Sequence, residues 1–212
     1  MTGEIHNQAS LPRWHGSQRR IGLTGGIASG KTSIGTFLKK IKGFPILDAD
    51  AYAHEALEPG KVSTTTILER YGDAIKDQIK DNPPGINRSA LSKIIFADSN
   101  ERLWIEQLIH PIVQKRLKEE LDKRKNAHVI VLIIPLLFEA KFTALCNEIW
   151  IVNCTRNQQI KRLMKRDGLS KKEAEVRIKA QWPIEKKLPF ADVIIDNSRE
   201  YDSWLVEVDN LC

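Results

Sequence analysis

The chain has 212 residues, of which 42% are hydrophobic and 28% are charged, with a net charge of +6. This length and composition are typical of one globular domain, and no apolar run approaches the ~18 residues that a membrane-spanning helix needs. The three cysteines form no CxxC pair, so we expect reduced thiols in a cytoplasmic protein.

The first 20 residues lack the apolar core of a secretory signal, and Glu4 argues against a transit peptide. We expect residues 1–20 to form a poorly ordered N-terminal extension, followed by a single domain over residues 21–212.

Short apolar runs then alternate with helical patterns along the chain. Buried strands are expected at residues 21–24, 44–48, 129–135, 148–152 and 192–196. Helices are expected at residues 31–42, from Asp98 into the 120s, at 171–181 and at 201–211, with a loop at 81–85. Asp98 and Glu101 fit a capping box, and Pro111 is expected to kink or restart the long helix. The alternation predicts a three-layer α/β/α fold around a five-stranded parallel sheet.

The stretch IGLTGGIASGKTSIG at residues 21–35 fits the pattern G-x-x-x-x-G-K-[ST], with a strand expected before it and a helix after it. Its glycines let successive backbone N–H groups point at phosphates, and the helix N-terminus adds partial positive charge. Lys31 is expected to reach the β- and γ-phosphates, and the Thr32 hydroxyl to hold Mg²⁺. The loop therefore predicts ATP bound by Gly25, Gly26, Ile27, Ala28, Ser29, Gly30, Lys31 and Thr32.

The sequence beyond the loop narrows the class of P-loop protein. The DxxG and NKxD motifs of GTPase switches do not occur, and the chain is short for a motor, which leaves a small kinase. Asp48 and Asp50 end the second strand, at the sheet edge where ligands bind. There they can hold Mg²⁺ or accept the proton of an attacking hydroxyl, although an acidic turn that caps the next helix is the plainer alternative. Few basic residues come after them, which favours a hydroxyl acceptor over a nucleoside monophosphate.

The positive charge is concentrated in residues 156–187, which carry a net charge of +7 and leave −1 for the rest of the chain. A cationic flap over ATP, or a solvated helical face, explains this segment. A nucleic-acid-binding ATPase would also use it, but residues 156–180 lack the interleaved aromatic side chains of a stacking surface.

The segments GLTGGIASGKT and ILDADAYAHEALEPG resemble the dephospho-CoA kinase family, and the resemblance continues through NRSALSKIIFAD, IHPIV, IIPLLFE, RLMKRDGLSKKEAEVRIKAQ and ADVIIDNS. It implies that ATP phosphorylates the 3′-hydroxyl of the ribose of dephospho-CoA. It also implies a helical CoA-binding region at about residues 51–125 and a lid at about residues 156–188. The protein would be a monomer whose partners are small-molecule substrates only. It would bind neither nucleic acid nor a membrane.

The resemblance also implies roles for single residues. Asp50 would be the general base, and Asp48 would bind Mg²⁺ or position that base. Lys31, Arg162 and Arg166 would stabilise the transferred phosphoryl group, and Asn197 would lie beside the adenine. Possible acceptor contacts are His54, Arg88, His110 and Glu139. Each of these residues could instead have a purely structural role. It could lie on a solvated helix face, place a charge at the start of a helix, or pack in the protein interior. A nucleoside or nucleotide kinase of the same fold remains the alternative enzyme.

Overall fold

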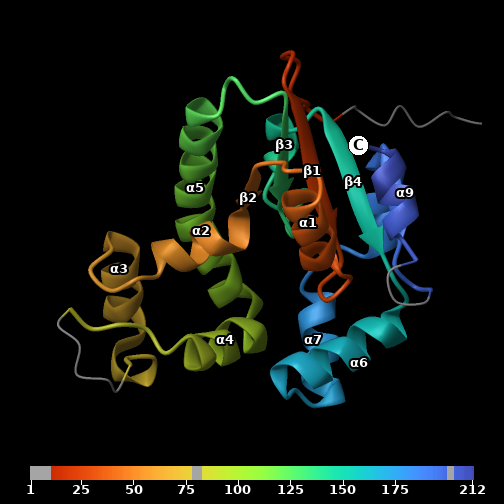
Figure 1. The fold of residues 1–212 in the computed structure, drawn as a ribbon. Coiled ribbons are helices and arrows are strands. Elements are labelled where there is room, and N and C mark those ends of the chain that lie inside the picture. The colour runs from red at the N-terminus through yellow and green to blue at the C-terminus, as the bar shows by residue number, and fades with distance from the viewer. Residues whose placement is uncertain (1–10, 78–82, 200–202) are drawn as a thin grey trace, which may run out of the picture.

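A computed structural model of the chain describes residues 11–77, 83–199 and 203–212 (Figure 1). A parallel sheet of five strands forms its centre, in the order β2-β3-β1-β4-β5. The strands are β1 (Arg19–Gly25), β2 (Ile46–Asp48), β3 (Val129–Ile133), β4 (Glu148–Asn153) and β5 (Val193–Asp196). All five predicted strands are thereby confirmed, and the sheet is parallel as expected.

Helices cover both faces of the sheet because successive residues of each strand point to opposite sides. In β3, Val131 and Ile133 belong to the core under α1 (Lys31–Lys40) and α9 (Leu205–Asn210). Their neighbours Ile130 and Leu132 belong to the core under α5 (Ser99–Lys123). The expected three-layer α/β/α architecture is therefore present. The last helix begins at Leu205, and the predicted start at Tyr201 lies outside the described residues, as does part of the predicted loop at 81–85.

Most of the remaining helices follow β2 or β4, and the longer ones lie beyond the carboxyl ends of the strands (Figure 1). One group follows β2 and consists of α2 (Ala49–Ala56), α3 (Val62–Tyr71), the short helix η1 (Gly72–Ala74) and α4 (Arg88–Ala97). The other follows β4 and consists of α6 (Arg156–Asp167), α7 (Lys171–Lys179), α8 (Ile184–Lys187) and η3 (Leu188–Phe190). Between β3 and β4 lies η2 (Phe142–Leu145). No helix in the described ranges has the length and apolar character to cross a membrane.

The long helix α5 differs from its prediction in one detail. Of the two outcomes expected at Pro111, a restart does not occur, because the helix continues through the proline, whose missing N–H removes only one of many backbone hydrogen bonds. Asp98 does cap it by accepting a hydrogen bond from the Asn100 N–H, at 2.7 Å. Glu101, however, forms a bidentate ion pair with Arg70 of α3 instead of completing a capping box.

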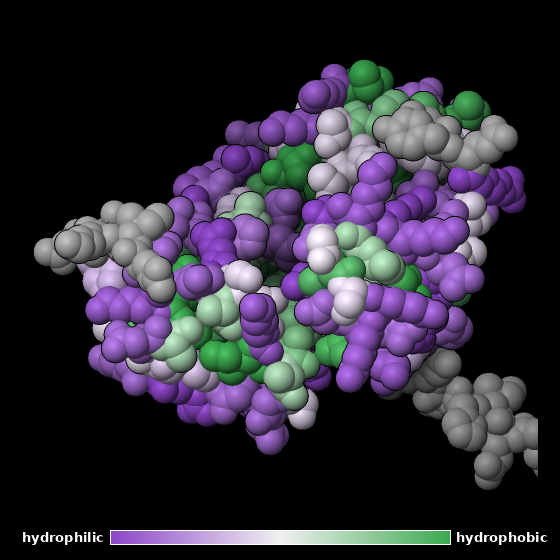
Figure 2. All heavy atoms as spheres, turned by 90° about the horizontal axis from the view of Figure 1, so that it is seen from below, coloured by the Kyte–Doolittle hydropathy of each residue, from purple (hydrophilic) through white to green (hydrophobic). Residues whose placement is uncertain are grey.

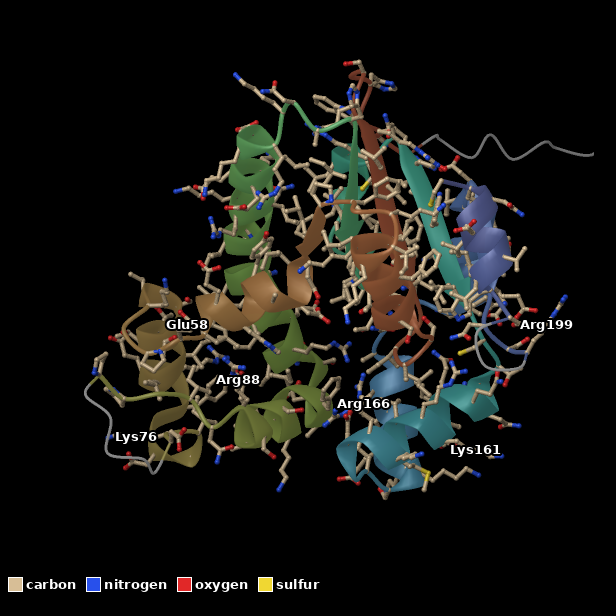
Figure 3. The ribbon with its side chains drawn as sticks, in the orientation of Figure 1. Glu58, Lys76, Arg88, Lys161, Arg166 and Arg199 are labelled. Atoms are coloured by element: carbon tan, nitrogen blue, oxygen red, sulfur yellow. The ribbon has the colours of Figure 1, made fainter. Side chains whose placement is uncertain are left out.

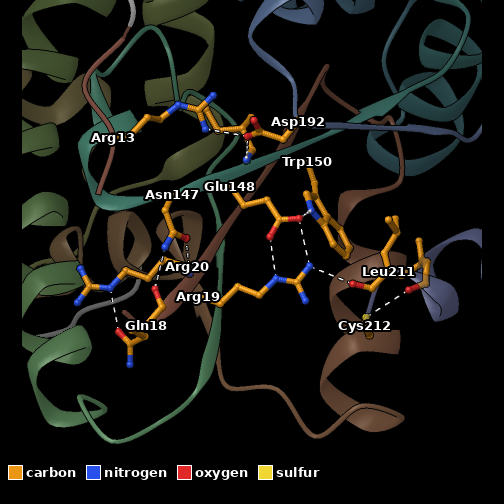
Figure 4. Close-up of polar contacts among 12 residues, drawn as sticks. Arg13, Gln18, Arg19, Arg20, Asn147, Glu148, Trp150, Asp192, Leu211 and Cys212 are labelled. Atoms are coloured by element: carbon orange, nitrogen blue, oxygen red, sulfur yellow. Dashed lines mark hydrogen bonds and ion pairs between the residues drawn. The ribbon is translucent and has the colours of Figure 1, made fainter. Parts of the chain in front are cut away.

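The expectation of a poorly ordered extension is wrong for residues 11–20. β1 already begins at Arg19, whose guanidinium bonds both carboxylate oxygens of Glu148 (Figure 4). Arg13 pairs with Asp192 at 2.8 Å, and the Trp14 ring stacks under the guanidinium of Arg20 at 3.6 Å. Arginines in this segment thus dock on partners far along the chain, which composition alone did not indicate. Residues 1–10 lie outside the described residues.

Candidate functional site

The glycine-rich loop has a backbone that ordinary residues cannot easily adopt. Gly25 has a φ of +143°, and a Cβ atom there would lie 2.3 Å from the carbonyl oxygen of Val152. Gly30 has a φ of +108° and precedes the first residue of α1. Ala28 holds a left-handed conformation with a φ of 57°. These turns fold residues 25–30 back on themselves between β1 and α1.

The carbonyl groups of the loop are bound by side chains from α6 and from the residue that follows β5. Gln159 of α6 donates to the Ile27 carbonyl at 2.7 Å, and Arg162 lies 3.3 Å from the Ser29 carbonyl. Asn197, directly after β5, also donates to Ser29, at 2.7 Å. With the carbonyls engaged, the N–H groups of Ala28 and Gly30 have no acceptor within the described chain. The loop is therefore built to receive an anion at its free N–H groups and at the N-terminus of α1.

A cavity of about 670 Å³ opens beside the loop. It contains both the P-loop lysine and the second carboxylate of the DAD motif, which sequence analysis placed at the same sheet edge. Residues from α2, from the segment after β3, from α6 and from the segment after α7 complete its walls. The lining consists of Ile27, Ala28, Ser29, Gly30, Lys31, Thr32, Asp50, Pro135, Leu136, Arg162, Lys165, Arg166 and Gln181.

Lys31 is a buried cation at the base of this cavity. Its Nζ donates to the carbonyls of Gly25 and Gly26, at 3.2 and 2.8 Å. Burial lowers its pKa to about 8, although the negative charge of Asp50 acts in the opposite direction. A cation that is costly to bury and lacks an anionic partner in direct contact gains stability when a phosphate arrives.

Asp50 also lines the cavity, from the first turn of α2. Asp48 fixes this turn because its Oδ1 accepts the N–H of Asp50 at 2.9 Å, as an N-cap does. Asp50 is open to the solvent of the cleft, yet the surrounding protein atoms desolvate its carboxylate and raise its pKa. The nearby charge of Asp48 raises it further, while Lys31 lowers it. A carboxylate of raised pKa facing a phosphate site is suited to accept a proton.

The lid arginines occupy different positions. The Arg162 guanidinium contacts the carbonyl groups of Ala28 and Ser29 in the loop. It also lies 3.1 Å from the Asn197 carbonyl. Arg166 lines the cavity and pairs with Asp167, and Figure 3 shows it at the end of α6 that faces α4. Asn197 is buried under the loop, where its Nδ2 would lie 2.1 Å from a Cβ atom at Gly30. In this structure Arg162 and Asn197 thus support the loop.

The predicted acceptor contacts fall into two groups. His54 and Arg88 are exposed and adjacent in the helical group after β2, with Arg88 NH2 3.4 Å from the His54 carbonyl. Figure 3 shows Arg88 in this group. His110 packs edge-on against Phe142, and burial lowers its pKa. Glu139 is held by Lys187 instead. Only the first pair is open to an acceptor that approaches over the helical group, whose surface is hollowed beside the lid (Figure 2).

Glu139 and Lys187 form a buried ion pair that sequence analysis did not anticipate. The Lys187 side chain is 0% exposed, and its Nζ lies 2.8 Å from Glu139 Oε1. The same oxygen accepts the Trp182 N–H at 2.8 Å, so the pair ties the end of the lid to the segment after β3. Gln159 and Gln181 were also missed as site residues, because a glutamine in a helical or loop segment carries no sequence motif.

The protein alone supplies only some of the oxygen ligands that Mg²⁺ needs, and a bound nucleotide would supply the others. The described ranges contain no cluster of three or more His, Cys, Asp or Glu side chains arranged to hold a metal. Mg²⁺ in kinases is bound by one or two protein oxygens together with substrate phosphates, so such a cluster is not required. Thr32 is exposed on the cavity wall, and Asp48 keeps its Oδ2 outside the hydrogen bonds of the helix cap.

Known proteins resemble the chain over almost its whole length. A family model described as dephospho-CoA kinase matches residues 19–203. A dephospho-CoA kinase of Prochlorococcus marinus is 54% identical over 202 residues, which are 95% of this chain and 96% of the relative. Among solved structures, TT1252 from Thermus thermophilus has a TM-score of 0.75 at 28% identity and covers 92% of this chain and 97% of its own. Dephospho-CoA kinase from Campylobacter jejuni has a TM-score of 0.64 at 27% identity, with 91% and 94% covered.

Proposed function

The chain belongs to the dephospho-CoA kinase family, and we propose that the cavity between the glycine-rich loop and Asp50 is where it carries out that family's reaction. The γ-phosphoryl group of ATP is transferred to the 3′-hydroxyl of the ribose of dephospho-CoA, which gives CoA and ADP. The observation that carries the assignment is that Lys31 and Asp50 line the same cavity and are close enough for their charges to shift each other's pKa.

Each residue has a task that follows from its place. The free N–H groups of the loop and the Lys31 ammonium bind the phosphates of ATP. Asp50 accepts the proton of the acceptor hydroxyl as that oxygen attacks phosphorus. Arg166 supplies positive charge from the lid, and Arg162 keeps the loop carbonyls turned away from the phosphates. His54 and Arg88 are proposed contacts of the acceptor.

We also propose Mg²⁺ as the metal of this site, held by the Thr32 hydroxyl and the free oxygen of Asp48. The ion would neutralise charge on the phosphates. Asp48 has a second task that needs no metal, because it orients Asp50 through the helix cap. A monomer in the cytoplasm remains our proposal, and the buried positions of Cys146 and Cys154 agree with reduced thiols.

The reaction is tested by incubating the protein with ATP, Mg²⁺ and dephospho-CoA and separating the products by chromatography. We expect CoA and ADP in equal amounts, and little product when adenosine or AMP replaces dephospho-CoA. Equal turnover of adenosine or AMP would instead support a nucleoside or nucleotide kinase.

The lowered pKa of Lys31 predicts proton uptake when nucleotide binds. The free protein holds Lys31 with a pKa of about 8, and a bound phosphate raises that pKa again. At roughly pH 9 much of the free protein has neutral Lys31, so ADP binding takes up a proton and its affinity falls as pH rises. At roughly pH 6.5 Lys31 is already charged and contributes no uptake. Calorimetry in buffers of different ionisation enthalpy measures this, and an uptake that does not increase between the two pH values would contradict it.

A further inference from the structure

One residue of the loop is held from both sides by lid glutamines. The Ile27 N–H donates to Gln181 Oε1 at 2.8 Å, and the Ile27 carbonyl accepts from Gln159 Nε2 at 2.7 Å. Gln159 lies in the helix that enters the lid, and Gln181 lies in the segment that leaves it. Both ends of the lid are therefore bonded to the phosphate loop at the same residue.

Gln181 and Lys31 bind opposite sides of one peptide group in the loop. The peptide group between Gly26 and Ile27 accepts from Lys31 Nζ through its carbonyl, at 2.8 Å, and donates to Gln181 through its N–H. A single peptide group thus separates the ammonium of Lys31 from the amide of Gln181. In P-loop kinases this lysine reaches the β- and γ-phosphates.

The nitrogen of the Gln181 amide is free to bind a ligand. Its Oε1 is engaged by Ile27, while Nε2, which carries two donor hydrogens, has no acceptor within the described chain. The side chain lines the 670 Å³ cavity of Lys31 and Asp50 and also a neighbouring cavity of about 570 Å³. An unpaired donor on the wall of an anion site gains a partner when phosphate enters.

The main chain next to Gln181 is fixed. The Trp182 N–H donates to Glu139 Oε1 at 2.8 Å, and Lys187 holds the same carboxylate. The Trp182 ring also stacks on Phe138, with 6.1 Å between ring centroids. The Gln181 amide is therefore held at the loop before any ligand arrives, which lowers the ordering cost of a contact made there.

We propose that Gln181 is a further phosphate-binding residue of this site. Its Oε1 holds the loop at Ile27, and its Nε2 donates to an oxygen of the terminal phosphoryl group of ATP. The proposal rests on the assignment of the loop as the ATP site, and it adds a contact specific to the group that is transferred.

The Gln181→Glu variant separates the two functions of the side chain. A glutamate keeps an oxygen that accepts the Ile27 N–H, but it replaces the donor by negative charge beside the phosphoryl group. Calorimetric titration should show binding of a non-hydrolysable ATP analogue weakened by about tenfold or more, with ADP binding changed by less than about threefold. The kcat should fall below that of Gln181→Ala, which loses the donor without adding charge.

Asn157→Asp is the matched control, because it replaces an amide by a carboxylate in the same segment and so adds the same charge. Asn157 is exposed in the first turn of α6 and lines neither cavity. This variant should bind both nucleotides as the unsubstituted protein does.

Two results would overturn the proposal. If Gln181→Glu retains more activity than Gln181→Ala, the side chain only positions the loop. If ADP and the ATP analogue lose affinity equally, the contact is not with the terminal phosphoryl group. Should Gln181→Glu fail to fold, as judged by its thermal unfolding, Gln181→Ala decides alone, because the proposal requires it to weaken the analogue more than ADP. A Lys31→Ala variant tests the loop assignment independently, because ADP binding should be lost when the loop is the nucleotide site.

Discussion

The Asp50→Asn variant is expected to bind ATP and to lose about 10²-fold or more in kcat. The side chain keeps its size and its place in the first turn of α2, where Asp48 caps the backbone. The variant loses the carboxylate, whose pKa is raised by desolvation and by the charge of Asp48. The acceptor hydroxyl then has no group to take its proton in the transition state. Single-turnover measurements with saturating ATP and dephospho-CoA isolate this step.

Asp48→Asn is the comparison that separates the two carboxylates. An asparagine caps a helix about as well as an aspartate, so Asp50 should stay in place. If Asp48 binds Mg²⁺, this variant should need more Mg²⁺ for half-maximal rate, whereas Asp50→Asn should not respond to added Mg²⁺. An Asp50→Asn variant with unchanged turnover would remove Asp50 from the role of general base.

Lys187→Met is expected to destabilise the fold by roughly 3–5 kcal/mol, because it leaves the buried carboxylate of Glu139 without its counter-charge. The methionine fills similar space, so a cavity contributes little to the loss. Chemical denaturation measures the change in the free energy of unfolding. Activity should fall as well, since the pair fixes the segment that carries Gln181 and Trp182.

Adding Glu139→Gln to Lys187→Met should restore much of that stability. Glutamine retains an oxygen that accepts the Trp182 N–H, and it removes the unpaired charge. Glu139→Gln alone should be destabilising, because it leaves the ammonium of the fully buried Lys187 unpaired. Equal stability of the single Lys187→Met and the double variant would show that packing, not charge pairing, holds this segment.

Local sequence patterns predicted the parts of the site that are local in the chain. Gly25, Gly30 and Lys31 lie within seven residues, and the strand and helix that flank them are read from the adjacent sequence. The position of Asp50 was predictable because ligands bind at the carboxyl ends of parallel strands. The five strands were equally accessible, since continuous apolar runs mark strands buried on both faces.

Contacts between distant segments could not be predicted in this way. Glu139 and Lys187 are 48 positions apart, and only the packing of α8 against the segment after β3 brings them together. The proximity of Asn197 to the site was predictable from its strand, but the direction of its amide, toward Ser29, was not. The same holds for Arg13, whose partner Asp192 is 179 residues away.

The two glutamine contacts at Ile27 also constrain how the lid can move. If the lid rotated as one rigid body, it would have to break the hydrogen bond of either Gln159 or Gln181 to Ile27. Because Gln159 and Gln181 hold both ends of the lid, we expect bending at the turn between α6 and α7. Gly168 ends α6 there, with a φ of 68°. Arg177 then travels with the tip, and in this structure it already reaches Ser92 of the opposite helical group, at 3.3 Å. If residues 156–188 act as the lid that we propose, we expect closure to bend the α6–α7 turn toward α4 while both glutamines stay bonded to the phosphate loop.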